Sequence, residues 1–102
     1  MPPKPHPPSL SQEAEADAAS AVEWYIGEGA FTAAHDFLDE IEHAMRLLAQ
    51  FPNIGETGRH NTRMLPLHKF PYSLVYRRQD DAIRIIAIAH HSRRPGYWIG
   101  RR

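Results

Sequence analysis

The hydrophobic pattern of this chain changes its period at Pro52, and that change limits the folds the chain can adopt. Before Pro52, apolar residues recur every three or four positions, as they do on the buried face of an α-helix. After Pro52 they alternate, as they do on a β-strand with one buried face. We therefore expect helices in the first half of the chain and strands in the second.

The helical half divides into two amphipathic segments. Residues 12–26 follow Ser9 and Ser11, which are both suitable N-caps, and a Gly-Glu-Gly sequence at 27–29 ends this segment. The second segment begins at Phe31 and ends before Phe51-Pro52, so the two helices should form an antiparallel hairpin. Trp24 and Tyr25 should line the core or a groove wall, and the core of the second helix should contain Phe31, Phe37, Leu38, Ile41, Met45 and Leu48.

The second half contains three predicted strands, at residues 63–68, 72–78 and 83–89. Pro66 cannot donate to a ladder, so the first strand should be an edge strand or carry a bulge. The last strand is apolar on both faces, which predicts a central position with cover on each side. The predicted fold is α+β, with an N-terminal antiparallel helix hairpin packed on one face of a small, mainly antiparallel sheet of three to four strands.

The remaining properties indicate one small domain. We expect it to span residues 9–102, after a flexible proline-rich arm at residues 1–8. The chain has no cysteine, which excludes disulfides and thiolate metal sites, and its histidines lack the spacing of metal ligands. No apolar stretch is typical of a secretory signal or a membrane span. We expect a cytoplasmic protein without a metal or cofactor.

The net charge of zero is a cancellation between two halves of opposite sign. Residues 51–102 hold 10 Lys and Arg against 3 Asp and Glu, whereas residues 1–50 hold 2 against 9. A field of this kind suggests that the second half meets an anion, either nucleic acid or an acidic protein segment. The alternative is an acidic, solvated helix pair packed on a cationic sheet, with no charged partner at all.

Several short motifs of the second half occur in an order that resembles a known family. They are Pro-x-x-Gly at 52–55, Arg-x-Leu at 63–65, Phe-Pro-Tyr at 70–72, Val-Tyr-Arg at 75–77, Ile-Ala-His at 88–90 and Arg-Pro-Gly-Tyr-Trp at 94–98. Placed after a helix hairpin, they resemble the RelE/ParE superfamily of type II toxins. The closing Arg-Pro-Gly-Tyr-Trp is most similar to the ParE-like branch, the plasmid stabilisation toxins.

The resemblance implies a growth-inhibiting toxin that forms a hetero-oligomer with a cognate antitoxin. ParE-like toxins bind and poison DNA gyrase without known chemistry of their own, and a flexible antitoxin segment wraps their helices and sheet. Family members usually open with a strand, but Pro5, Pro7 and Pro8 occupy its place here, so this strand should be short, displaced or missing. An antitoxin could add a strand to the open edge of such a sheet.

RelE-like members instead cleave mRNA on the ribosome, and this alternative requires catalytic side chains. The resemblance places Met64 and Pro66 where the family has lysines, and Ser73 where it has an arginine. Only His91 and Tyr97 match, so a ribonuclease would have to use His91, Arg93 and Tyr97. A third alternative is an inactive relative that retains only its antitoxin.

The candidate contact residues lie on the strands and in the last ten or so positions of the chain. His90 and His91 should point to opposite faces of the sheet. Tyr97 and Trp98 should either cap the helix hairpin or form an exposed anchor for a partner. The candidates for binding the target or the antitoxin are Arg63, Arg77, Arg84, His90, Arg93, Arg94, Tyr97 and Trp98.

Overall fold

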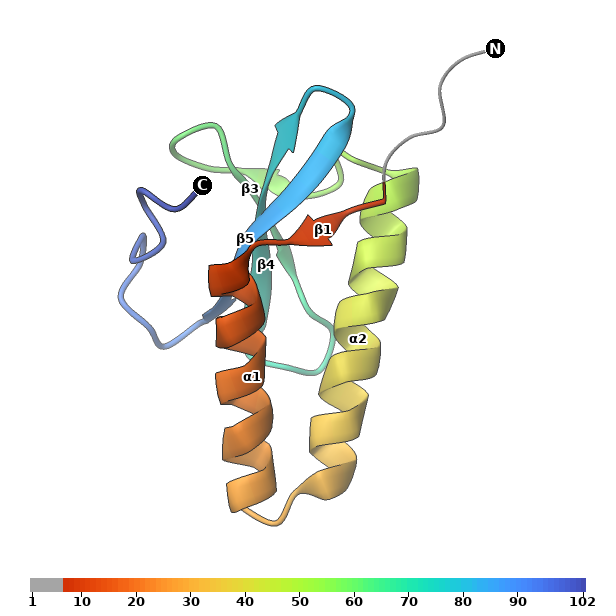
Figure 1. Cartoon of the computed structure of the whole chain (residues 1–102), viewed down its shortest axis with the longest axis vertical. Coiled ribbons are helices and arrows are strands. Elements are labelled where there is room, and N and C mark those ends of the chain that lie inside the picture. Colours follow the sequence, from red (N-terminus) through yellow and green to blue (C-terminus); the bar gives the residue numbers. More distant parts are fainter. Residues whose placement is uncertain (1–6) are drawn as a thin grey trace.

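A hairpin of two helices packs on one face of a five-stranded sheet (Figure 1). The computed structural model describes residues 7–102, so most of the arm predicted at residues 1–8 lies outside the described residues. In chain order the elements are β1 (Ser9–Leu10), α1 (Gln12–Gly27), α2 (Phe31–Gln50), β2 (Glu56–Thr57), β3 (Arg63–Pro66), β4 (Tyr72–Gln79) and β5 (Ala82–His90). This is the α+β fold that the sequence predicts. None of the described helices is both long enough and apolar enough to cross a membrane.

The strands follow the order β1-β5-β4-β3-β2, and only the β1–β5 pair is parallel. The sheet has more strands than expected because β1 and β2, of two residues each, pair at its edges. The opening strand is short, as the prolines before it require. Because β2 pairs only with Arg63 and Met64, Pro66 lies on the open side of β3, where no N–H is needed.

Both helices begin and end where their sequence signals lie. The Ser11 hydroxyl accepts a hydrogen bond from the Ala14 N–H at 3.1 Å, which caps α1. Gly29, with φ of 74°, reverses the chain between the helices, a conformation that glycine adopts without strain. The helix α2 has no side-chain cap and ends at Gln50, just before Pro52.

The main core lies between the hairpin and the sheet. From α2 it includes Phe37, Ile41 and Leu48, which pack against apolar residues of β4 and β5. The core prediction is wrong for Phe31 and Leu38, which are 66% and 45% exposed. Trp24 is 60% exposed and lies outside the core, but it lines a hollow with Ala21 and Tyr72, which agrees with the expected groove wall. Phe31 opens α2 at the end of the hairpin, and Leu38 and Trp24 flank the buried stripes of their helices. Met45 and Tyr25 are half-buried.

The strand β5 is buried on both faces, as its composition predicts. A bulge helps, because the pairing moves from Val75–Ala87 to Tyr76–Ile85 and leaves Ile86 unpaired. Ile86 and Ala87 therefore both belong to a second cluster, on the face away from the helices. The cover on this face is the C-terminal segment, residues 91–102, which we call the tail.

Trp98 is the main side chain of this cover. It is 6% exposed and packs in the second cluster with Val75 and Ile86. Trp98 is thus neither an exposed anchor nor a cap on the helix hairpin, and both sequence expectations for it are wrong. The reason is that β5 is apolar on both faces and both must be covered, whereas the helices cover only one face.

Tyr76 explains the Pro-x-x-Gly motif at 52–55. Its fully buried hydroxyl donates to the Pro52 carbonyl and accepts from the Gly55 N–H, each at 2.9 Å. A Cβ at Gly55 would lie 2.7 Å from the Tyr76 ring, so only glycine fits. The motif therefore fastens the loop after α2 to the middle of the sheet.

The tail should behave as part of the folded core. We expect Trp98→Ala to lower the free energy of unfolding by about 3–5 kcal/mol, because it empties the second cluster. The matched control Trp24→Ala removes an exposed indole and should cost less than about 1 kcal/mol. Equilibrium urea unfolding measures both, and equal losses would show that the tail is not part of the core.

Candidate functional site

A groove with a volume of about 470 Å³ lies beside the tail, and we call it the tail groove. Three segments line it: the loop after β2, the middle of β3, and the end of β5 with the tail. Its apolar lining includes Met64, Ala89 and Trp98, which are half-buried or buried. No Asp or Glu lines the groove, and its positively charged or imidazole side chains are Arg59, His90, His91, Arg93 and Arg94.

The structure separates the sequence candidates into two groups. His90, Arg93, Arg94, Tyr97 and Trp98 all line the tail groove. The strand arginines instead donate to backbone carbonyls: Arg63 to Asn53 and Gly55, Arg77 to His60 and Arg101, and Arg84 to Arg102. These three side chains hold loops and the chain end in place. Sequence reasoning missed Arg59, which comes from a loop with no recognisable motif.

The adjacent histidines are held on different faces, as their alternation predicts. The His91 Nε2 atom lies 2.8 Å from the hydroxyl of Ser73, which is buried. The His90 ring packs edge-on against Tyr72, and its Nδ1 accepts from the Ser92 N–H at 3.0 Å. Among the described residues, one set of potential metal ligands is close together, His35, Asp36 and Asp39, and it is exposed on α2 outside the groove.

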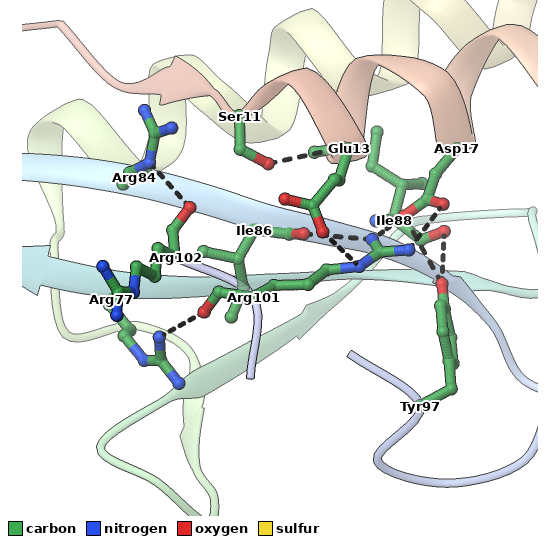
Figure 2. Close-up of polar contacts among 11 residues, drawn as sticks. Ser11, Glu13, Asp17, Arg77, Arg84, Ile86, Ile88, Tyr97, Arg101 and Arg102 are labelled. Carbon is green, nitrogen blue, oxygen red and sulfur yellow. Dashed lines mark hydrogen bonds and ion pairs between the residues drawn. The ribbon is translucent and has the colours of Figure 1, made fainter. Parts of the chain in front are cut away.

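A cluster of three residues, the tail latch, fastens the tail to α1 (Figure 2). Arg101 binds the Asp17 carboxylate through both terminal nitrogens, at 2.6 and 3.3 Å. The third member, Tyr97, donates its hydroxyl to Asp17 at 3.4 Å. The side chains of Asp17 and Arg101 are only 9% and 17% exposed, so this pair is shielded from solvent.

The tail latch also caps the edge of β5 beyond the end of β1. The last backbone bond to the N-terminal segment runs from the Ser11 N–H to the Ile85 carbonyl. Past this point, the Ile88 N–H donates to the Asp17 carboxylate at 3.0 Å, and Arg101 donates to the Ile86 carbonyl at 3.1 Å. The sheet edge that was expected to be open is therefore capped here by side chains, which blocks strand addition at these groups.

The tail latch changes the pKa values of Tyr97 and Arg101. Burial, and next the negative charge of Asp17, raise the pKa of the Tyr97 phenol. The hydrogen bond to Asp17 raises the pKa of Arg101, which stays charged. The Arg93 guanidinium lies 3.9 Å from the centre of the Tyr97 ring, a cation–π contact. Through Tyr97, the latch thus helps to place Arg93 at the tail groove.

Comparison with known proteins identifies the family. Residues 9–95 match the family model of the ParE toxin of the type II toxin–antitoxin system parDE. The chain belongs to the ParE toxin family.

The structure agrees with this assignment. The fold is similar to that of a chain from a chromosomal ParDE toxin–antitoxin system of P. aeruginosa, with a TM-score of 0.75 and 21% identity. The likeness covers 86% of this chain and 98% of that one. No curated protein matches the sequence. The resemblance drawn from the motifs of the second half is confirmed.

In this ParE-family toxin, the residues at the positions that RelE-like enzymes use for cleavage lie in different surroundings. Met64 lines the groove and Pro66 is exposed at the end of β3, and neither side chain can transfer a proton. Ser73 is buried and bonded to His91. His91 and Tyr97 line the groove, so the roles assigned to them and to Arg93 in a ribonuclease stay predictions.

Sequence reasoning also missed Asp17 of α1 as a residue that holds the tail. The signal was present, since Asp17 lies three residues after Ala14 and four before Ala21, the buried residues of that helix. A carboxylate on a buried stripe needs a partner. Its partner, Arg101, lies at the far end of the chain.

The tail latch should stabilise the toxin. Asp17→Asn keeps the shape of the side chain but leaves Arg101 without its buried counter-charge, so the free energy of unfolding should fall by about 3 kcal/mol. The control is Glu13→Gln, because Glu13 is 3.4 Å from the Arg101 Nε but 55% exposed, and it should cost under about 1 kcal/mol. Equilibrium urea unfolding measures both variants, and equal losses of unfolding free energy would contradict the role of Asp17.

Stability should also depend on pH through Tyr97. The pKa of the Tyr97 phenol is raised in the folded protein. Below the unfolded value of about 10, the phenol is therefore protonated in both the folded and the unfolded protein, and its contribution to stability is complete. Above that value only the unfolded state ionises, and stability falls as the pH rises towards the folded pKa. Tyr97→Phe should reduce this alkaline loss, leaving the part due to Tyr25 and Tyr72, whose pKa values burial also raises. Urea midpoints at about pH 9 and pH 11 measure the difference; an unchanged alkaline loss in the variant would contradict the assignment.

Proposed function

We propose that this toxin inhibits growth by binding and poisoning DNA gyrase, and that a cognate antitoxin neutralises it in a hetero-oligomer. The observation that supports this most is the match to the ParE toxin model over residues 9–95. Gyrase acts in the cytoplasm, so the proposal includes a cytoplasmic site of action. The toxin would act by occupying its target, without catalysis of its own.

The tail groove is the proposed contact for the target. A toxin that acts by binding needs a surface that can gain energy from a partner, and the groove combines apolar lining with exposed cations. Chemistry is less well supported there, because Met64 and Pro66 replace two basic residues of the RelE pattern. Ser73, in place of the third, has its hydroxyl buried against His91. A binding role therefore fits this set of residues better than cleavage does.

The helix hairpin is the proposed contact for the antitoxin. Another hollow is lined by Leu10, by Ala18 and Val22 of α1 and by Leu38 of α2. Three large apolar side chains near the hairpin turn are also exposed: Trp24, Ile26 and Phe31. Several large exposed apolar side chains on one helix hairpin are typical of protein contacts. An antitoxin segment that wraps the helices would cover them.

Induction of the toxin alone in a bacterial cell tests the proposed target. We expect pulse-labelling to show DNA synthesis falling within minutes, before protein synthesis, because gyrase is needed ahead of every replication fork. Purified toxin should also inhibit supercoiling by gyrase in vitro, and co-expressed antitoxin should restore growth.

Other outcomes of this experiment identify the alternatives. If protein synthesis falls first and messages are cut on translating ribosomes, the toxin is an mRNA endoribonuclease. If neither synthesis falls although the folded chain accumulates, it is an inactive relative that retains its antitoxin. Either result overturns the gyrase proposal.

A further inference from the structure

We infer that the tail groove receives an extended acidic segment of a partner protein, in which an apolar side chain is flanked by carboxylates. This inference rests on the proposed function, because it gives the chemistry of the partner segment that the toxin engages. It concerns the groove alone, however, and can be tested without gyrase.

The first support is the hydrogen bonding of the arginine side chains. Among the described residues, the side chains of Arg59 and Arg94 have no hydrogen bond or ion pair within the chain, and both are exposed. By contrast, Arg63, Arg77, Arg84 and Arg101 all donate to oxygen atoms of the protein. Arg59 and Arg94 come from two distant segments and meet at one groove. A guanidinium free of internal partners can bind a carboxylate with two parallel hydrogen bonds.

The second support is the apolar lining between these segments. Met64 is half-buried and Ile99 is 46% exposed, so both offer carbon surface within a groove of about 470 Å³, large enough for a few side chains. The buried Ala89 and Trp98 lie beneath this surface. An apolar side chain of a peptide gains free energy by leaving water here, at about 25 cal/mol for each Å² buried. Carboxylates beside it would meet the cations, and the groove has no acidic residue to repel them.

The same features disfavour nucleic acid. Surfaces that bind single strands offer exposed aromatic rings on which bases stack. In the tail groove, Trp98 is buried, and the Arg93 guanidinium lies over the ring of Tyr97. Phosphates placed against the apolar lining would lose water without gaining a partner. An acidic peptide matches both the charge and the apolar part of the lining.

The fluorescence of Trp98 provides a direct test. The chain has 2 tryptophans, and Trp24 is 60% exposed, so Trp24→Phe leaves a folded protein with its only indole in the groove. The probe is a capped synthetic peptide in which one leucine is flanked by glutamates. We expect a saturable change in Trp98 emission, which weakens as salt is added.

Matched variants separate groove contacts from general charge. Arg59→Gln and Arg94→Gln, each in the Trp24→Phe background, should weaken peptide binding roughly three- to tenfold. Arg46→Gln removes the same charge from an exposed position on α2 and should leave binding unchanged. Exchanging the leucine of the peptide for serine should weaken binding by a similar factor, because the apolar contact is lost.

Three results would overturn the inference. The first is the absence of a saturable signal in the folded Trp24→Phe protein. The second is equal binding of a peptide with glutamine in place of glutamate, which would exclude the carboxylate contact. The third is tighter binding of single-stranded oligo(dT), lost on Arg59→Gln, which would identify a nucleic-acid groove. Because wild-type pulse-labelling does not depend on these peptides, gyrase poisoning can stand when this inference fails.

Discussion

The rest of the structure depends on the burial of β5 on both of its faces. The helix hairpin covers one face, and the other would be left in water if the tail did not fold back across it. The segment that forms most of the tail groove is therefore also a structural layer of the domain. This dual role means that deleting the tail would remove the proposed binding surface and the cover of one face of β5 together. Single side-chain exchanges at the groove are the cleaner way to separate function from folding.

The tail latch solves a second problem that the short β1 creates. A buried ion pair alone seldom stabilises a protein much, because removing two charges from water costs about as much as their attraction returns. Here the same groups also satisfy the backbone of β5, through the Ile88 N–H and the Ile86 carbonyl. Side chains thus replace a missing strand partner. They also protect an edge that could otherwise pair with another chain, and they join the two ends of the sequence across the sheet.

Much of the fold could be predicted because its signals are local. The period change at Pro52, the cap at Ser11 and the proline on the open side of β3 each act on neighbouring residues. The site was harder to predict from the sequence, because its contacts join segments that are far apart along the chain. Charge counting found the cationic half but could not show that Arg63 and Arg77 are engaged by carbonyls while Arg59 is free. Helical spacing likewise placed Phe31 in the core although it lies at the hairpin turn, and it could not reveal a partner for Asp17 some eighty residues away.

The two layers of the domain place its two proposed contacts on different sides of the sheet. The acidic helix hairpin lies on one face of the sheet (Figure 1). The second cluster, which includes Trp98 of the tail groove, lies on the other face. An antitoxin confined to the hairpin would leave the groove accessible. The proposed neutralisation would then require that the antitoxin also reach around the sheet edge, or that the proposed target contact both layers. At the edge of β5 the Ile86 carbonyl and both backbone groups of Ile88 are already engaged by side chains of the tail latch. An antitoxin that passes around this edge would therefore meet side chains of the latch in place of these backbone groups.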